Sequence, residues 1–185
     1  EFNLSNAIAA YSSVKCLGYS DDQIIPFLAK LSPPTGRMQQ LENSNIWIDY
    51  AHTPDALDNA LSTLKKHYPE FKIRVIFGCG GDRDKSKRQI MGKIASENAD
   101  SIILTNDNPR SEEPQVIIDD ILAGTKVEND IQVILDRGDA ITSAIQNLGE
   151  DEVLLIAGKG HETNQVIGSK SFPFSDIEVA LDALI

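Results

Sequence analysis

The sequence contains little cysteine and no long apolar segment. Its 185 residues include two cysteines, Cys16 and Cys79, which are far apart and lack the spacing of metal ligands. Such sparse cysteine is typical of a reducing compartment, so a cytoplasmic protein is expected. No apolar run approaches the roughly 20 residues that a membrane span needs, and no secretory signal occurs. Membrane-spanning and disulfide-stapled proteins are therefore excluded.

Positive charge is also scarce. Lysine and arginine total 17 against 28 aspartates and glutamates, which leaves a net charge of -11. Such an acidic chain is unsuited to wrapping nucleic acid or docking on an anionic membrane, so neither partner is expected. The three histidines show no zinc-site spacing, so no metal site is assigned. No serine or cysteine nucleophile is evident beside His161, so a structural role is expected for it. The chain begins with Glu1 rather than methionine, and we expect it to be a piece of a longer polypeptide.

What is present is a regular alternation of short apolar runs with segments of helical periodicity. Strands are expected at residues 45–51, 72–78, 101–105, 131–135 and 151–158, and helices at 53–69, 84–99, 114–124, 139–149 and 175–184. Continuous apolar strands are typical of a parallel sheet that is buried on both faces. The expected fold is therefore α/β, with an open, mainly parallel Rossmann-like sheet and helices on both faces. The helix at 84–99 is expected to bury Ile90, Met91, Ile94 and Ala95.

A separate helical segment precedes this alternation. Two short helical patterns occupy residues 6–18 and 20–32, and the proline-stiffened stretch "SPPTGR" is typical of a linker. We therefore predict a short helical tail of another domain and its linker at residues 1–36, and the α/β domain at residues 37–185.

Glycine and polar residues follow four of the expected strands, in the stretches "DYAH", "GCGGDRD", "TNDNPR" and "GKGHE". Ligands of open parallel sheets collect beyond the carboxyl ends of the strands, so these stretches predict one shared site. In "GCGGDRD" the glycines free backbone N–H groups for an anion, and the Arg83 guanidinium can grip a carboxylate or phosphate. A turn without ligand is the alternative. A dinucleotide fingerprint fits poorly, because Arg83 stands where its third glycine belongs.

In "DNPR", Pro109 restricts its own backbone and that of Asn108. Asn108 and Arg110 are thereby preorganised for a small ligand with a carboxylate, unless the stretch is only the turn before the next helix. In "GKGHE", Glu162 can accept from an ammonium, whereas Lys159 and His161 could both be solvated. Two arginines and one carboxylate suit an amino acid that carries charge at both ends.

The "DYAH" stretch places Asp49 and His52 beside a helix N-terminus. A strand end followed by a helix cap explains these residues equally well.

The motifs "DYAHTPDAL", "GCGGDRDKSKR", "DNPR" and "GKGHE", in this order and at these separations, resemble the C-terminal part of Mur ligases. The resemblance covers essentially the whole chain. "FNLSNAIAA" and "GRMQ" are similar to the end of the family's central ATPase domain and the entry to its third domain. The resemblance implies that residues 1–36 end the central ATPase domain and that residues 37–185 form the amino-acid-binding ligase domain.

The resemblance implies an ATP-dependent acid–amino-acid ligase of peptidoglycan precursor synthesis, hence a role in cell-wall biogenesis, cell shape and cell division. ATP would phosphorylate the terminal carboxylate of UDP-N-acetylmuramoyl-L-alanyl-D-glutamate, and an incoming amine would attack the acyl phosphate to give an amide, ADP and phosphate. In this family "DNPR" is associated with members that add meso-diaminopimelate. No G-x-x-x-x-G-K-[ST] loop occurs in the chain. The phosphate loop and the Mg²⁺ ligands are therefore expected in upstream domains, and this chain alone is expected to be inactive.

The family resemblance also implies residue roles. Binding of meso-diaminopimelate is implied for Arg83, Asp107, Asn108, Arg110, Gly158 and Glu162. Approach to ATP is implied for Asn3, Asn6, Arg37, Asp49, Tyr50 and His52. No catalytic residue is assigned within this chain.

Three other interpretations stay open. The chain could belong to a related ligase that adds lysine or a glutamate tail, although "DNPR" disfavours this. It could be a nicotinamide-dependent oxidoreductase domain of the same topology, or a non-catalytic module that binds an amino acid or another anion.

Overall fold

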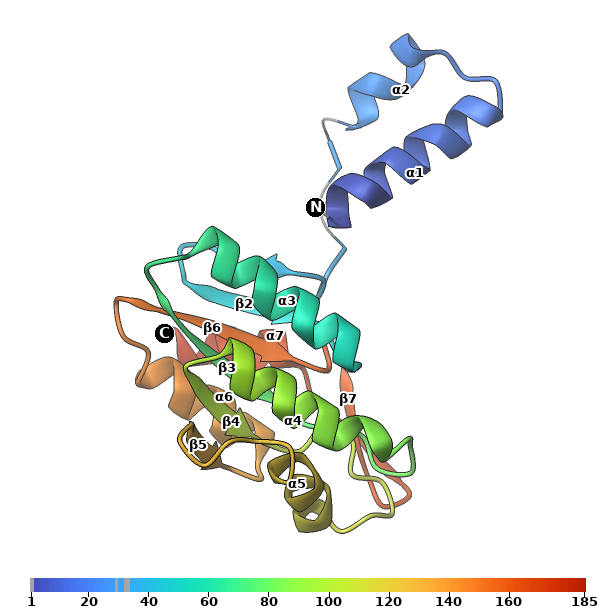
Figure 1. The fold of residues 1–185 in the computed structure, drawn as a ribbon. Helices are drawn as coiled ribbons and strands as arrows, with labels where there is room; N and C mark the ends of the chain where they lie inside the picture. The colour runs from blue at the N-terminus through green and yellow to red at the C-terminus, as the bar shows by residue number, and fades with distance from the viewer. Residues whose placement is uncertain (1, 29, 32–33) are drawn as a thin grey trace. The chain divides into compact units, whose positions relative to one another are not determined.

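The computed structural model describes residues 2–28, 30–31 and 34–185. The chain divides into two compact units, Glu1–Pro34 and Thr35–Ile185. The first contains α1 (Phe2–Cys16) and α2 (Asp21–Leu28), drawn in blue in Figure 1. The Asp21 carboxylate joins these helices: it accepts a hydrogen bond from the Tyr11 hydroxyl at 2.7 Å and pairs with Lys15 at 2.6 Å.

The second unit is built on a six-stranded sheet. Its strands are β1 (Gln39–Gln40), β2 (Ile46–Asp49), β3 (Lys72–Phe77), β4 (Ser101–Leu104), β5 (Asp130–Val133) and β6 (Glu152–Ala157). They lie in the order β1-β2-β6-β3-β4-β5, and all neighbours pair in parallel except β1 with β2. The predicted α/β fold with a mainly parallel sheet is confirmed.

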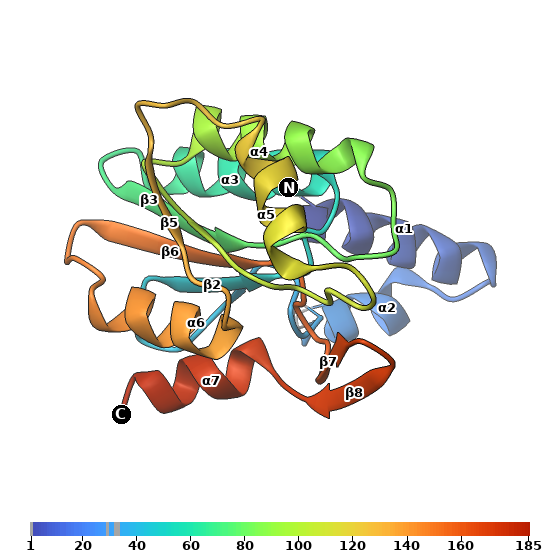
Figure 2. The same ribbon diagram turned by 90° about the horizontal axis from the view of Figure 1, so that it is seen from below.

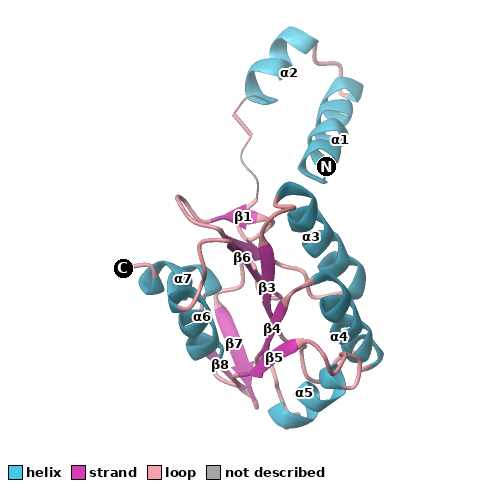
Figure 3. Cartoon of the chain, turned by 60° about the vertical axis from the view of Figure 1, so that its left-hand side comes forward, coloured by secondary structure: helices cyan, strands magenta, loops and turns pink. Residues whose placement is uncertain are grey.

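Helices cover both faces of this sheet (Figures 2 and 3). On one face lie α3 (Pro54–His67), α4 (Ser86–Asn98) and α5 (Pro114–Leu122), and on the other lie α6 (Arg137–Gln146) and α7 (Asp176–Ala183). The period of two along a strand divides the core: Val75 and Phe77 of β3 pack with the first set, and Ile76 with the second. Both faces are therefore buried, as the continuous apolar strands predicted.

The expected buried stripe of α4 is partly wrong. Met91 and Ala95 are fully buried, but Ile90 is 49% exposed, and the fully buried Arg88 takes its place on the inner face. The stripe runs through positions 88, 91, 92 and 95, which is the ordinary helical spacing of a packed face. An arginine can occupy this stripe because two carboxylates, those of Glu112 and Asp120, accept its hydrogen bonds.

A two-stranded hairpin, β7 (Asn164–Ile167) with β8 (Lys170–Pro173), was not predicted from the sequence. Its strands are short and largely exposed, so they carry no long apolar run. The hairpin contacts the loop after β4, where Arg110 forms an isolated bridge with Ile167. It therefore belongs to the same region as the predicted site.

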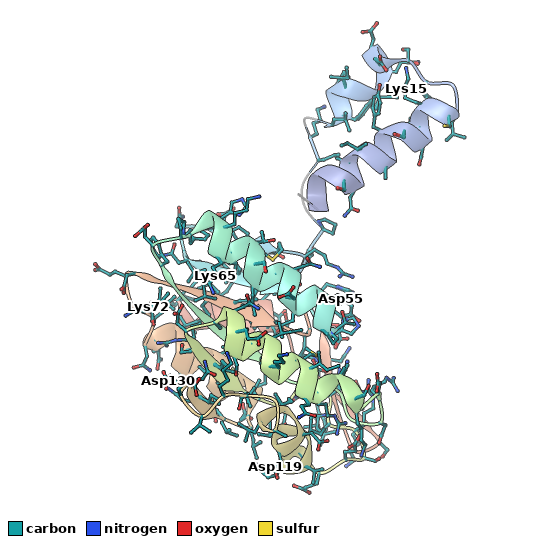
Figure 4. All side chains as sticks on the ribbon, in the orientation of Figure 1. Lys15, Asp55, Lys65, Lys72, Asp119 and Asp130 are labelled. Carbon is teal, nitrogen blue, oxygen red and sulfur yellow. The ribbon has the colours of Figure 1, made fainter. Side chains whose placement is uncertain are left out.

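Charged side chains gather on the surface of this unit. Asp55, Lys65, Lys72, Asp119 and Asp130, which are labelled in Figure 4, are all exposed. Within residues 2–28, 30–31 and 34–185, no helix is both long and apolar enough to span a bilayer.

Candidate functional site

The four polar strand exits meet at one edge of the sheet. Because β2, β6, β3 and β4 are neighbours and parallel, the segments after them lie side by side. The Gly158 N–H donates to the Asp49 carbonyl at 3.0 Å, which joins the exits of β6 and β2. A Cβ on Gly78 would lie 2.0 Å from the Thr105 carbonyl oxygen, so the exits of β3 and β4 approach as closely as glycine allows.

The Asn108 side chain makes three hydrogen bonds at this edge. Its Oδ1 accepts hydrogen bonds from Lys159 Nζ at 3.2 Å and from the Val166 N–H at 2.8 Å. Its Nδ2 donates to Glu162 Oε2 at 3.1 Å. Lys159 Nζ lies 2.9 Å from the same Glu162 oxygen, which closes a three-membered network. Asn108 is 6% exposed and Lys159 is fully buried, so water competes little for these contacts.

The Glu162 carboxyl is held in its charged form by this network. Burial by itself would raise its pKa, but the hydrogen bond and charge of Lys159, together with the Asn108 amide, outweigh burial and lower the pKa. Among the described residues, the side-chain donors that reach this carboxylate share Oε2. The carboxylate therefore has acceptor capacity left for a cationic group.

The two arginines predicted for the site lie over the same glycine. A Cβ on Gly80 would lie 2.9 Å from Arg110 Nη1 and 3.7 Å from Arg83 Cγ. Arg110 is half-buried and donates from Nη1 to the carbonyls of Gly81 at 2.8 Å and Asn108 at 3.3 Å. Arg83 is exposed and donates to the Asp82 carbonyl at 3.0 Å. Only Arg110 is therefore held firmly by the fold.

Side-chain contacts clamp the loop after β3 to the loop after β4. Asp82 has a positive φ of 53°, and its carboxylate accepts hydrogen bonds from the Ser111 hydroxyl at 2.7 Å and backbone N–H at 3.1 Å. Arg88 donates to both carboxylate oxygens of Glu112, at 2.8 and 3.0 Å. Hydrogen bonds from Arg88 and Lys85 lower the pKa of Glu112 to about 2. At neutral pH the clamp is fully charged.

A buried ion pair lies against the backbone at the exits of β4 and β6. Arg137 and Asp176 are both fully buried and form two hydrogen bonds, at 2.7 and 2.8 Å. Arg137 also donates to the carbonyls of Ala157 at 2.9 Å and Asn106 at 3.4 Å. Burial would lower the pKa of Arg137, but the charge and hydrogen bonds of Asp176 raise it, so the guanidinium stays charged.

The structure brings together all six residues that the resemblance linked to meso-diaminopimelate. Asn108, Arg110 and Glu162 are joined by the contacts described above, and Arg83 and Arg110 both lie beside Gly80. Asp107 is buried, and its Oδ2 would lie 2.9 Å from a Cβ on Gly158, whose φ is 117°. The six residues come from three strand exits and form one contiguous group.

Four of the residues linked to ATP also form a group. The Arg37 guanidinium lies 4.6 Å from the centre of the Tyr50 ring, which lies 4.4 Å from the His52 ring. Asp49 is buried and accepts a hydrogen bond from the Met38 N–H at 2.7 Å. Burial raises the pKa of the Asp49 carboxyl, although backbone hydrogen bonds and the nearby Arg37 charge act against it.

The other two residues linked to ATP lie in the helical unit. Asn6 is exposed on α1. Asn3 belongs to the same helix, but its side chain lies outside the described residues. Both residues belong to the first compact unit, Glu1–Pro34.

The interpretation that Lys159 could be solvated is wrong, because its side chain is fully buried, and Arg88 and Arg137, which are also buried, were not singled out from the sequence. The spacing of Arg88 from Met91 and Ala95 could have placed it on the inner face of α4. Lys159 directly follows a buried strand, but its partner Asn108 lies 51 residues away, so no local signal reveals the contact. His161 is exposed, with its ring 4.9 Å from that of Tyr50.

The fold and the site together define an α/β domain that holds opposite charges at the carboxyl edge of a parallel sheet. The sequence profile described as "Mur ligase, glutamate ligase domain" matches residues 36–160. The chain belongs to this family of ligase domains.

Relatives of known function agree with the family. The chain is 47% identical over 179 residues to the UDP-N-acetylmuramoyl-L-alanyl-D-glutamate–2,6-diaminopimelate ligase of Rickettsia conorii, covering 96% of this chain and 37% of that protein. It is 46% identical to the enzyme of the same name from Coxiella burnetii, covering 99% of this chain and 38% of that protein. The chain therefore spans little more than a third of the length of these relatives.

Solved structures show the same fold. A structure of a UDP-N-acetylmuramoyl-L-alanyl-D-glutamate–2,6-diaminopimelate ligase matches with a TM-score of 0.78 and 37% identity, covering 100% of this chain and 38% of that one. The UDP-N-acetylmuramate–alanine ligase of Thermotoga maritima matches with a TM-score of 0.62 at 20% identity, covering 99% and 37%. The second likeness concerns the fold alone.

Proposed function

We propose that this chain is the amino-acid-binding part of an ATP-dependent ligase that adds meso-diaminopimelate to UDP-N-acetylmuramoyl-L-alanyl-D-glutamate. The reaction would serve peptidoglycan precursor synthesis in the cytoplasm, through an acyl phosphate of the muramoyl dipeptide. The observation that carries the proposal is the group formed by Arg110, Asn108 and Glu162, which offers donors for a carboxylate beside an acceptor for an ammonium. The relatives named for this activity support it.

Each side chain of the group has a chemical role in this proposal. Arg110 and the Asn108 Nδ2 would hold the carboxylate at the distal end of meso-diaminopimelate, and Glu162 its ammonium. Asp107 and Gly158 would line the same end, since a Cβ on Gly158 would approach the Asp107 carboxylate. The exposed Arg83 would add a second cation for the ligand's carboxylate.

Charge pairing explains how such a site would reject lysine. Lysine has the same spacing between its two amino groups but lacks the distal carboxylate, so its binding would leave the Arg110 charge without its ligand partner. A site built to pair a polar group discriminates strongly against an analogue without that group, by as much as ~10⁴-fold. The site should therefore prefer meso-diaminopimelate.

The nucleotide would be handled largely by other parts of the enzyme. Arg37 and Tyr50 present a cation and an aromatic face that suit a phosphate or a base, and Asp49 and His52 lie beside them. The chain has no G-x-x-x-x-G-K-[ST] loop, so its own residues do not fit the β- and γ-phosphates. We place that loop in upstream domains of the same polypeptide, and we assign residues 1–36 to the end of its central ATPase domain, with Asn3 and Asn6 near ATP.

Mg²⁺ would be held in those upstream domains too. Within the described ranges, no group of three or more His, Cys, Asp or Glu side chains is arranged to hold a metal ion. When bound, the ion would neutralise charge on the transferring phosphoryl group. The residues of this chain would position the attacking amine.

The test is an amide-forming assay of the complete polypeptide that carries this chain, with meso-diaminopimelate and lysine compared as acceptors. The wild-type enzyme should prefer meso-diaminopimelate, and Arg110→Ala should abolish that preference. Arg74→Ala is the matched control, because Arg74 is a half-buried arginine at the opposite end of β3, paired with Glu152 at 2.9 Å. An unchanged preference in Arg110→Ala would refute the assignment. The isolated chain should release no ADP.

A further inference from the structure

The side-chain amide of Asn108 has one possible orientation in this fold. A lysine ammonium and a backbone N–H can only donate, and both point at the same Asn108 atom, at 3.2 and 2.8 Å. That atom must therefore be the oxygen. The opposite atom faces Glu162 Oε2 at 3.1 Å and must be the nitrogen, because a charged carboxylate only accepts.

We propose that Lys159 is a positioning residue, which with the Val166 N–H fixes the Asn108 amide so that only its N–H groups face the amino-acid site. The inference rests on the proposed function and deepens it, because it explains how Asn108 is set to meet a carboxylate. Without these two donors the amide could turn and present its oxygen, which would repel a carboxylate. Lys159 thus controls the polarity of the neighbouring Asn108 amide and acts on the ligand's carboxylate through it.

The environment of Lys159 suits this role. Its side chain is fully buried, so the ammonium must be compensated inside the protein, and Glu162 and Asn108 supply the acceptors. Gly158 and Gly160, on either side, have φ values of 117° and 53°, a backbone path that turns this segment tightly after β6. Removing the ammonium would leave the Asn108 oxygen with the Val166 N–H as its remaining donor and Glu162 with one fewer partner.

The second donor to the Asn108 oxygen is the Val166 N–H of the β7–β8 hairpin, which is held in place by further hydrogen bonds. The Arg110 N–H donates to the Val166 carbonyl at 3.1 Å, and the Gly168 N–H donates to the Arg110 carbonyl at 2.7 Å. Gln165 Nε2 donates to the Asp107 carbonyl at 2.8 Å. The Val166 N–H is therefore held at a defined place against the loop after β4. The hairpin and Lys159 approach Asn108 from different segments and act on one atom.

The first experiment needs no ligand. A long-range NMR correlation through the hydrogen bond should connect the Val166 N–H with Cγ of Asn108 in the wild-type chain. The bond from Gly168 to Arg110, at 2.7 Å, serves as the internal positive control. In Lys159→Met the first correlation should weaken at least about twofold while the control correlation persists. Lys170→Met, which removes an exposed lysine of the same hairpin, should change neither.

The second experiment measures coupling. Calorimetric titration with meso-diaminopimelate should show about tenfold weaker binding for Lys159→Met in the wild-type background. In an Asn108→Ala background the same substitution should change the affinity about twofold or less, because the amide that Lys159 orients is gone and only its contact with Glu162 remains. A merely structural lysine would weaken both backgrounds alike, and that result would overturn the proposal.

The outcomes separate the two proposals. If the wild-type chain shows the Val166–Asn108 correlation but does not bind meso-diaminopimelate, the ligand assignment fails and the positioning role stands. If the correlation is missing while the Gly168 control is seen, or is unchanged in Lys159→Met, the positioning role is wrong whatever the ligand. Should Lys159→Met not fold, the wild-type correlation and the less drastic Lys159→Gln variant decide in the same way.

Discussion

The two halves of the strand-exit edge are built differently. On the side that we propose for the amino acid, Asn108 and Lys159 are buried, and both polar atoms of the Asn108 amide form hydrogen bonds. On the side that we propose for the nucleotide, Arg37 and His52 are exposed and contact the Tyr50 ring. Hydrogen bonds inside a protein fix direction, whereas stacking and cation–π contacts tolerate sliding.

This difference matches the needs of the two ligands that we propose for this edge. A side that must distinguish a carboxylate from a hydrogen atom needs fixed donors, and the fold supplies them from three strand exits and a hairpin. A nucleotide held mainly by other domains, as we propose, would need only a contact surface here. The following experiments, ordered by expected effect, would break or sharpen this contrast.

The largest effect should come from Asp176→Ala. It leaves the buried Arg137 guanidinium without its carboxylate, which typically costs about 3–5 kcal/mol. Urea unfolding followed by fluorescence of Trp47 would measure the loss. Asp139→Ala, an exposed acid in the first turn of α6, is the control and should cost less than about 1 kcal/mol. Equal losses would mean that the buried pair does not support the amino-acid side.

Gly81→Ala should come next. A Cβ there would lie 1.9 Å from the Pro109 carbonyl oxygen, so the loops after β3 and β4 would have to separate, at about 2–3 kcal/mol. Gly138→Ala is the matched control, because a Cβ there would have an Asp136 oxygen at 3.2 Å as its nearest neighbour. The stability of this variant should stay within about 1 kcal/mol of wild type. Thermal unfolding would rank the two, and a neutral Gly81→Ala would contradict the close approach of the loops.

Glu112→Gln tests the clamp through its dependence on pH. The folded pKa of Glu112, about 2, lies below its ordinary 4.5. Its contribution to stability is therefore complete above about pH 4.5 and is lost as the pH falls towards 2. At pH 7 the variant should be less stable by about 1–2 kcal/mol, and the gap from wild type should close near pH 2. Unfolding curves at several pH values would show this, and a gap independent of pH would exclude the charged clamp.

Arg37→Met should have the smallest effect. It removes one exposed cation–π contact with Tyr50, worth about 0.5–1 kcal/mol. Thermal unfolding should shift by only a few degrees, and hydrogen exchange at Asn108 and the hairpin should stay unchanged. A large loss of protection there would show that the two sides are mechanically linked, against the contrast drawn above.

Much of the site could be predicted from the sequence. The order of strands and helices follows from periodicity, and the motifs after the strands identify Asn108, Arg110 and Glu162 as candidates. Their grouping follows from the sheet, whose parallel strands β2 to β6 end at one edge. Ile90 was wrongly expected on the buried face of α4, and the buried Arg88 was not foreseen. Hydrophobicity does not reveal that two carboxylates accept the hydrogen bonds of a buried guanidinium.

The amino-acid sequence by itself determined the α/β class, the polar edge of the sheet and the family, since all three depend on local periodicity and on contiguous motifs. Only the tertiary structure decided which way the Asn108 amide faces, that Lys159 is buried beside it, and that an unforeseen hairpin holds the loop after β4. The partners of Asn108 in these contacts are separated from it by 51 positions (Lys159) and 58 positions (Val166) along the chain. Residues so far apart in sequence come into contact only when the sheet has formed.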